Sequence, residues 1–370
     1  MGGGPAGARA AFELAHAGRS VALIEKHALP RAKTCGGGLV WRGRERLPPG
    51  FALPIESECQ RARLVAYAGA APVEVVREIP IVTMTMRATL DAALVEFARK
   101  AGAKVHEATE LRGIERVNGA WRLDTSAGAF ECRVLVGADG ARGVLARLAG
   151  WTEPLATIPA LEAELEAPTQ AFAKTAVFDF GLATPGYAWV FPKCAHLSVG
   201  VLAARRGAKG LRAELERHCA RYGLERARVR EISGCVIPVR PRARCAKPGV
   251  LLVGDAAGLV DPLTAEGISL ALESGRLAAR AITQTNADPL RAAEEYARAL
   301  KRGILPELRL ARGFAALLYE HPVLARRVLA RNARAACEVL TDVVCGSRSY
   351  GKTLRDPRSW LALAGLRVRA

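Results

Sequence analysis

The chain has 370 residues, of which 50% are hydrophobic, so it can bury a sizeable core and form roughly two or three closely joined subdomains. It shows neither an apolar run of about 18 residues nor a secretory-signal pattern, so we expect no transmembrane helix, and its scattered cysteines argue against a disulfide framework or a zinc site. The net charge of +18 favours anionic partners, although arginine-rich genome composition is an alternative cause and no nucleic-acid motif accompanies it.

The first segment has the pattern of a dinucleotide-binding turn. Gly2, Gly4 and Gly7 form G-x-G-x-x-G: the first glycine allows a tight turn, the second the approach of a pyrophosphate and the third close helix packing. Residues 8–24 predict a helix and then a buried parallel strand that ends at Glu25. Glu25 lies about 20 residues beyond the glycines, where an acidic side chain accepts hydrogen bonds from ribose hydroxyls.

One element of this fold is missing from the sequence. A dinucleotide-binding sheet normally begins with a hydrophobic strand before the first glycine, and only Met1 stands there. That strand is usually central, so we expect an interrupted parallel sheet. Our interpretation is a start codon placed too late or a shortened chain.

The remaining chain changes character several times. Residues 31–39 predict a glycine-rich loop close to a ligand, 61–86 strands of another sheet, 90–102 a helix, 103–136 strands, and 161–239 strands with a helix at 211–222. A short strand at 249–253 precedes a long helix at 267–283, and helices follow. We therefore predict an α/β fold with an α+β insert. It comprises a Rossmann-type FAD-binding domain (1–40, 87–150 and 245–290), an inserted antiparallel β-sheet substrate domain (41–86 and 151–244) and a C-terminal helical region (291–370).

A second glycine-rich motif follows the strand at 249–253. Asp255 stands at the carboxyl end of this strand, where ligands of open α/β sheets bind, and it could accept a hydrogen bond from a ribityl hydroxyl. The helix that begins near Gly267 would point its first N–H groups to the same place and stabilise an anion on a reduced flavin ring. Glu266 is either part of this site or an ordinary N-terminal helix charge.

Together these motifs resemble the FAD-dependent geranylgeranyl reductase family, within the superfamily shaped like p-hydroxybenzoate hydroxylase. The resemblance covers nearly the whole chain and rests on residues 2–7 with Glu25, 33–39, 87–91, 137–141, 185–193 and 254–268. It implies FAD contacts at Ala6, Gly7, Glu25, Cys35, Gly36, Gly38, Arg87, Leu111, Asp255, Gly267 and Ile268, beside Gly2, Gly4 and Asp139 of the glycine motifs. Two positions depart from the family pattern. Gly143 replaces a usual serine, and a usual Gly-x-Gly is reduced to Gly200-Val201-Leu202.

Three residues are candidates for the chemistry: Cys35, Tyr187 and Trp189. Cys35 would lie near the flavin and help to place a proton, or it is simply a small packing residue. Tyr187 and Trp189 alternate with Phe191 on one strand face, as a flat apolar ligand wall requires, although the same pattern is typical of sheet core. The histidines form no cluster, so we assign no metal.

Arg87 has two interpretations. It could reach the FAD phosphates or ribose, or it could form an ordinary i,i+4 ion pair with Asp91.

The resemblance implies that reduced FAD reduces isolated C=C bonds of a polyprenyl chain on a lipid, a diphosphate, a quinone or a chlorophyll-type molecule. Only one dinucleotide turn is visible, so the electron donor is NADPH as a transient visitor, or ferredoxin. We expect a cytoplasmic protein whose arginine-rich C-terminal helices contact the inner face of an anionic membrane. Two alternatives stay open: a flavin-dependent monooxygenase or halogenase on the same scaffold, and a non-catalytic basic protein that binds membranes or nucleic acid.

Overall fold

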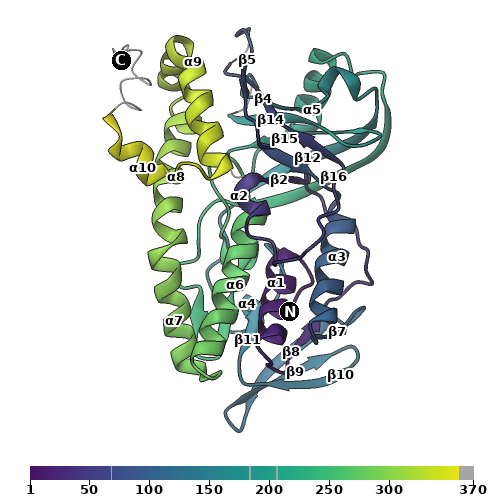
Figure 1. The fold of residues 1–370 in the computed structure, drawn as a ribbon, viewed down its shortest axis with the longest axis vertical. Helices are drawn as coiled ribbons and strands as arrows, with labels where there is room; N and C mark the ends of the chain where they lie inside the picture. Colours follow the sequence, from purple (N-terminus) through teal and green to yellow (C-terminus); the bar gives the residue numbers. More distant parts are fainter. Residues whose placement is uncertain (68, 183–184, 206, 358–370) are drawn as a thin grey trace.

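The computed structural model describes residues 1–67, 69–182, 185–205 and 207–357. In the view of Figure 1, an α/β part lies below a large sheet, and a row of C-terminal helices runs along one side of both. Segments far apart in the sequence therefore meet where the two parts join.

The parallel strands of the lower part form two separate sheets. Strand β1 (Ala22–Ile24) pairs with β7 (Lys104–His106), and β11 (Leu135–Gly137) pairs with β18 (Val250–Leu252), which also carries β17 (Ala246–Lys247). This is the interruption that we expected.

The first two residues link these sheets through their backbone. The Gly2 N–H donates to Ile24 O at 2.8 Å, and the amino group of Met1 donates to Val136 O at 2.9 Å. Met1 and Gly2 thus stand between β1 and β11, beside the strand ends where a nucleotide would bind.

Helix α1 (Pro5–His16) packs between α3 (Arg87–Lys100) and α6 (Ile268–Gln284). Its alanines and Gly275 of α6 allow a close approach, since a Cβ on Gly275 would lie 2.2 Å from the carbonyl oxygen of Ala6. The short helix α4 (Leu145–Leu148) follows β11. A small antiparallel sheet at the lower end of Figure 1 consists of β8 (Leu111–Val117), β9 (Ala120–Thr125) and β10 (Gly128–Cys132).

The upper sheet has seven strands in the order β16-β12-β15-β14-β13-β4-β5. Their bounds are β4 (Arg61–Val65), β5 (Val73–Val76), β12 (Thr157–Glu166), β13 (Thr175–Asp179), β14 (Gly186–Pro192), β15 (Leu197–Ala203) and β16 (Arg228–Pro238). The prediction of an antiparallel sheet is wrong for one pair, because β13 and β4 run parallel. Strands joined by a hairpin must be antiparallel, but these two belong to distant segments, so no tight turn fixes their direction.

A further small sheet joins the two parts of the molecule. Strand β6 (Val82–Met84) pairs with both β2 (Gly38–Val40) and β3 (Ser57–Cys59), and α2 (Trp41–Arg44) follows β2 directly. Residues 38–40, which we placed in the nucleotide-binding segment, thus hydrogen-bond to a strand of the inserted segment.

The two faces of the upper sheet have different neighbours. Helix α5 (Leu211–Arg221) covers one face with Leu215 and Cys219. On the other face, alternate residues of β14 form a buried aromatic cluster that also includes the described C-terminal residues Val344 and Cys345. Apolar side chains thus line both faces, as the near-continuous hydrophobic sequence of β14 and β15 requires.

Four C-terminal helices complete the described chain: α7 (Pro289–Arg302), α8 (Ile304–Glu320), α9 (Pro322–Cys345) and α10 (Tyr350–Arg355). Helix α9 packs against β5 at the edge of the upper sheet. Residues 358–370 of the predicted helical region lie outside the described residues. Among the helices that the structure describes, none combines the length and apolar character needed to cross a membrane.

Candidate active site

A cavity of about 650 Å³ lies where the two parts of the molecule meet. Its size is in the range of small-molecule and cofactor sites. Of the site residues predicted from the sequence, only Gly7 does not line this cavity. The others all do: Gly2, Gly4, Ala6, Glu25, Cys35, Gly36, Gly38, Arg87, Leu111, Asp139, Tyr187, Trp189, Asp255, Gly267 and Ile268. Gly4 and Asp255, which are 251 positions apart, therefore share one cleft.

The glycines at the start of the chain are required by close backbone contacts. Gly2 has a φ of 98°, and a Cβ there would lie 2.3 Å from the carbonyl oxygen of Ala138. A Cβ on Gly7 would lie 1.9 Å from Gly2 O, so Gly7 serves helix packing rather than the cavity wall. No side chain caps α1 at Gly4, so its first N–H groups are available to an anion in the cavity.

Two arginines stand beside this helix terminus. A Cβ on Gly4 would lie 3.8 Å from Arg31 Nη2 and 3.9 Å from Arg87 Nη2. Arg87 also forms the ion pair that the sequence offered as its alternative role, with both hydrogen bonds to Asp91 at 2.9 Å. Arg31 bridges Asp91 and Glu25 at 3.3 Å each. The paired carboxylates hold the guanidinium groups in place near an anion site.

Glu25 is buried at the end of β1 and is anchored by backbone. Its Oε2 accepts from the Gly3 N–H at 2.7 Å, and its Oε1 accepts from the His27 N–H at 3.1 Å. These bonds fix the carboxylate in the cavity wall and stabilise the glycine turn at the same time.

Asp139 caps α4 and explains the departure at position 143. Its Oδ2 accepts from the Leu145 N–H at 2.9 Å, while its Oδ1 is buried without a hydrogen-bond partner in the described chain. A Cβ on Gly143 would lie 2.1 Å from Asp139 Cγ. Glycine at position 143 thus makes room for the carboxylate, and a serine there would collide with it in this conformation.

Asp255 lies in the 3₁₀ turn Gly254–Ala257, directly after β18. Burial raises the pKa of its carboxyl group, and the nearby Lys33 and Arg87 only partly offset this effect. Asp255 also approaches the start of α6, since a Cβ on Gly267 would lie 3.4 Å from its Oδ1.

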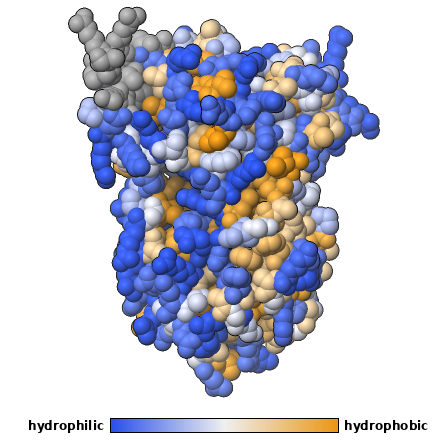
Figure 2. Space-filling view, in the orientation of Figure 1, coloured by the Kyte–Doolittle hydropathy of each residue, from blue (hydrophilic) through white to orange (hydrophobic). Residues whose placement is uncertain are grey.

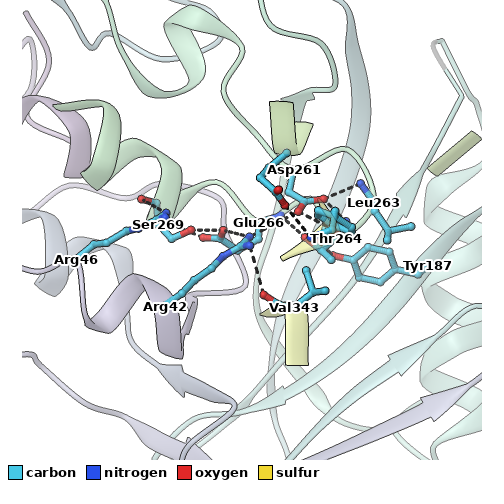
Figure 3. Close-up of polar contacts among 11 residues, drawn as sticks. Arg42, Arg46, Tyr187, Asp261, Leu263, Thr264, Glu266, Ser269 and Val343 are labelled. Atoms are coloured by element: carbon cyan, nitrogen blue, oxygen red, sulfur yellow. Dashed lines mark hydrogen bonds and ion pairs between the residues drawn. The ribbon is translucent and has the colours of Figure 1, made fainter. Parts of the chain in front are cut away.

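The loop before α6 is held by charged groups (Figure 3). Nη2 of Arg42 lies 3.6 Å from Asp261 Oδ2 and 3.1 Å from Glu266 Oε2. Glu266 also accepts from the Ser269 N–H at 2.7 Å, so it is an N-terminal helix charge as well as a residue of the cavity wall.

Three tyrosines hold the same loop. The Tyr187 hydroxyl, on the cavity side, donates to Thr264 O at 2.6 Å (Figure 3). Tyr319 of α8 and Tyr350 of α10 donate to other atoms of the loop at 2.7 and 2.9 Å. The C-terminal helices and the upper sheet thus fix the loop that follows Asp255.

The Cys35 loop lies against the aromatic strand. A Cβ on Gly36 would lie 3.0 Å from both Phe191 Cδ2 and Trp189 Nε1. The ammonium group of Lys193, which follows β14, donates to Gly36 O at 2.6 Å and to Thr85 O at 3.2 Å. This buried lysine ties the loop to the end of β14.

The far end of the cavity is apolar. Tyr187, Trp189 and Phe191 face it together, with consecutive ring centroids 6.1 Å apart. Further apolar lining comes from the sheet and from α9, and includes Ala62, Leu64, Phe178, Phe180, Leu202, Cys337, Leu340 and Val344. The aromatic strand is therefore both sheet core and cavity wall.

Comparison with known proteins supports a flavin site. A family model described as "FAD binding domain" matches residues 1–285. The chain is 35% identical over 301 residues to a digeranylgeranylglycerophospholipid reductase of Methanoculleus marisnigri, covering 76% of this chain and 74% of the relative. It is 30% identical over 338 residues to a menaquinone reductase of Mycolicibacterium smegmatis, covering 80% of each.

The chain belongs to the geranylgeranyl reductase family of FAD-dependent oxidoreductases. This confirms the resemblance and the cofactor class inferred from the sequence. The fold of this chain is also similar to that of a geranylgeranyl bacteriochlorophyll reductase-like protein from Thermoplasma acidophilum. The TM-score is 0.77 and the identity 24%, over 98% of this chain and 94% of the other.

The residues of this reductase-family cavity fit FAD. An uncapped helix terminus beside two arginines suits a diphosphate, and the glycine turn leaves space where a side chain would intrude. The buried Oδ1 of Asp139 and the carboxylate of Asp255 offer acceptors for hydroxyl or ring N–H groups. We expect the flavin end of the cofactor to lie between Asp255 and the Cys35 loop.

Sequence reasoning missed several residues of the reductase-family site. Arg31 stands at the start of the predicted glycine-rich loop, and its place there could have suggested a contact. Arg42 and Glu162 have no such signal, because their positions depend on how the sheet packs against the nucleotide-binding part. Lys193 ends the segment 185–193 of the resemblance, but nothing in the sequence indicated its buried contacts.

Proposed function

We propose that the protein reduces isolated C=C bonds of a geranylgeranyl-type polyprenyl chain, using hydride from reduced FAD. The observation that carries this proposal is one cavity with two chemically different ends. Its glycine and arginine end suits a dinucleotide, and its aromatic end suits a hydrocarbon. The names of the reductase relatives, whose printed substrates are prenylated lipids and a quinone, support the same class of substrate.

The residues contribute position and dryness. An isolated alkene has no carbonyl group to polarise, so it must be held close to the hydride donor and away from water. The aromatic wall of Tyr187, Trp189 and Phe191 meets both needs, and its π faces would stabilise positive charge that develops on a tertiary carbon. Bound FAD, once reduced, supplies the hydride.

A direct test uses purified protein loaded with FAD. Anaerobic reduction with dithionite, followed by a geranylgeranyl lipid or a prenylated quinone, should reoxidise the flavin and give a product heavier by one H₂ per bond. Oxygen uptake with a hydroxylated or halogenated product would instead support the monooxygenase or halogenase alternative. Colourless protein that binds no added FAD would support the non-catalytic alternative.

The electron donor is a separate part of the proposal. We propose that NADPH binds only transiently, because the sequence shows one dinucleotide-binding turn and FAD would occupy it. Reduced ferredoxin is the second candidate. Stopped-flow reduction of the bound flavin by each donor would distinguish them.

We also propose that the N-terminal end of α9 contacts an anionic membrane. Val323 and Leu324 are 67% and 50% exposed, and Arg326 and Arg327 follow them. Figure 2 shows hydrophobic residues on the upper part of the molecule, over the region where Figure 1 places α9 and β5. Apolar side chains beside basic ones suit the surface of an anionic bilayer.

Sedimentation with anionic liposomes tests this contact. Val323→Asp with Leu324→Asp should weaken binding at least tenfold, and high salt should weaken it further. Val229→Asp is the matched control, since Val229 is 47% exposed on β16. Binding that is indifferent to salt, lipid charge and both substitutions would contradict the proposal.

A further inference from the structure

A buried carboxyl group, that of Glu162, stands in the cavity wall on the side of the upper sheet. Glu162 of β12 pairs with Gly200 of β15, which in turn pairs with Trp189 of β14. Residues paired in this way share a face of the sheet. The three therefore form one row that faces the cavity, and a Cβ on Gly200 would lie 2.0 Å from Trp189 Cζ2. The indole thus lies over Gly200, beside Glu162.

A chain of donors ends on Glu162. Trp189 Nε1 donates to Ser198 Oγ at 3.3 Å, and the Ser198 hydroxyl donates to Glu162 Oε1. The backbone N–H of Cys35 also interacts with the Glu162 carboxyl group. Glu162 is thus connected to two of the three residues that the sequence nominated for the chemistry.

Several charged or titratable groups surround this carboxyl group: Glu164 of the same strand, Glu231 and Cys235 of β16, Lys193 after β14, and Cys35 and Lys33 of the loop. Burial and, to a smaller extent, the charge of Glu164 together raise the pKa of Glu162 to about 7, against the lowering effects of Ser198, Lys193 and the Cys35 N–H. Glu164 itself lies 2.8 Å from Nε2 of His196. Glu162 can therefore carry a proton at neutral pH.

We propose that Glu162 is the acid that gives a proton to the alkene carbon that does not receive the hydride. The inference rests on the proposed function and names a residue of the same site. The O–H bond of Glu162 breaks as a C–H bond forms on that carbon. Both electrons of the reduction come from the reduced flavin, which is oxidised. Glu162 remains as a carboxylate and regains a proton from water when the product leaves.

The principal test follows anaerobic reoxidation of reduced flavin by a prenyl substrate across neutral pH. In wild type, the rate should fall tenfold per pH unit above about 7, because the acid form of Glu162 disappears. Glu162→Gln should slow this step by about a hundredfold and remove the pH dependence. FAD content should remain that of wild type.

Two variants serve as comparisons. Glu164→Gln removes the neighbouring charge, so the rate should persist while its apparent pKa falls below that of wild type. Cys35→Ser tests the rival proton donor. If Cys35→Ser abolishes the pH dependence and Glu162→Gln preserves it, the assignment is wrong.

A second readout needs no bound flavin. Infrared difference spectra of flavin-free protein should show a carboxylic acid that titrates near pH 7, and Glu162→Gln should remove this band while Glu164→Gln shifts it. Persistence of the band in Glu162→Gln would overturn the proposal.

The two levels of inference fail differently. If none of the prenyl substrates reoxidises the reduced flavin of the wild-type protein, the proposed function is wrong, whatever the infrared result. If wild type reacts and Glu162→Gln matches it at every pH, only the assignment of Glu162 is wrong.

Discussion

The two ends of the cavity solve the problem of buried polar groups in different ways. At the nucleotide end, most charges are paired: Glu25 and Asp91 hold Arg31 and Arg87, and Glu25 also accepts from the Gly3 N–H. At the sheet end, the buried carboxyl group of Glu162 lies beside the aromatic cluster and accepts from a neutral hydroxyl, and no cation forms an ion pair with it among the described residues. Paired charges provide a fixed binding surface, whereas a carboxyl group that desolvation keeps protonated can give up a proton.

The most damaging substitution that we predict is Gly7→Ala, which disrupts only the nucleotide end of the cavity. Gly7→Ala places a Cβ 1.9 Å from the carbonyl oxygen of Gly2, so α1 must move away from the turn. We expect loss of bound FAD and destabilisation by about 3 kcal/mol, as for a backbone clash in a packed core. Flavin content after purification and thermal unfolding measure both. Gly313→Ala is the control, because Gly313 of α8 has open space around it and alanine there should stabilise the helix by about 0.5–1 kcal/mol.

The second prediction sharpens the difference in charge state. The folded-state pKa of Glu162, about 7, exceeds its ordinary value of 4.5, so protonated Glu162 favours folding. This contribution is complete below pH 4.5 and is lost as the pH rises through 7. It amounts to about 3 kcal/mol, at 1.36 kcal/mol per unit.

Glutamine cannot ionise, so Glu162→Gln should gain stability over wild type by about this amount between about pH 5 and about pH 8. Urea unfolding of flavin-free protein at both pH values measures the difference. An unchanged difference between variant and wild type at the two pH values would show that Glu162 is ionised throughout.

Gly200→Ala should disturb the sheet end of the cavity and leave the nucleotide end intact. Gly200→Ala would push the Trp189 indole away from the row that it forms with Glu162. We expect normal FAD content and roughly tenfold slower flavin reoxidation by substrate, since a displaced wall loses about 1.4 kcal/mol of alignment. Gly234→Ala on β16, where the nearest atom would be 3.6 Å away, is the matched control. Loss of FAD from Gly200→Ala would show that the two ends are not independent.

The same contrast explains what the sequence could predict. The glycine turn, Glu25 and Asp255 follow local rules that relate residue type to position at a strand end, and the structure places all of them around one cavity. Strand β12 gave no comparable signal. Its glutamates alternate with Leu161 and Leu165, the pattern of a strand with one face in water, yet Glu162 is 3% exposed because the nucleotide-binding part covers that face.

The direction of β4 beside β13 was unpredictable for a related reason. No turn connects the two strands, so their pairing depends on tertiary packing. Gly143 was noted in the sequence only as a departure from the family pattern. It lines the cavity, and the cause of the departure, the position of the Asp139 carboxylate, needs coordinates.

The smallest predicted effect concerns the loop that joins the two ends. Tyr187→Phe removes the hydrogen bond to Thr264 O, and Tyr350→Phe removes the one to Asp261 Oδ2. Thr264 lines the cavity, so water can replace the lost donor when no substrate is bound, and we expect a loss of only about 1 kcal/mol. Tyr350 is buried behind the loop. Without its hydroxyl, Asp261 Oδ2 still has Arg42 Nη2 at 3.6 Å. In both variants, the Kd for FAD measured by titration should therefore rise by less than tenfold. Only Tyr187→Phe should also raise the KM for prenyl substrate, because only its ring belongs to the aromatic wall. Equal KM values in the two variants would mean that the hydroxyl of Tyr187 supports the loop without affecting the position of the ring.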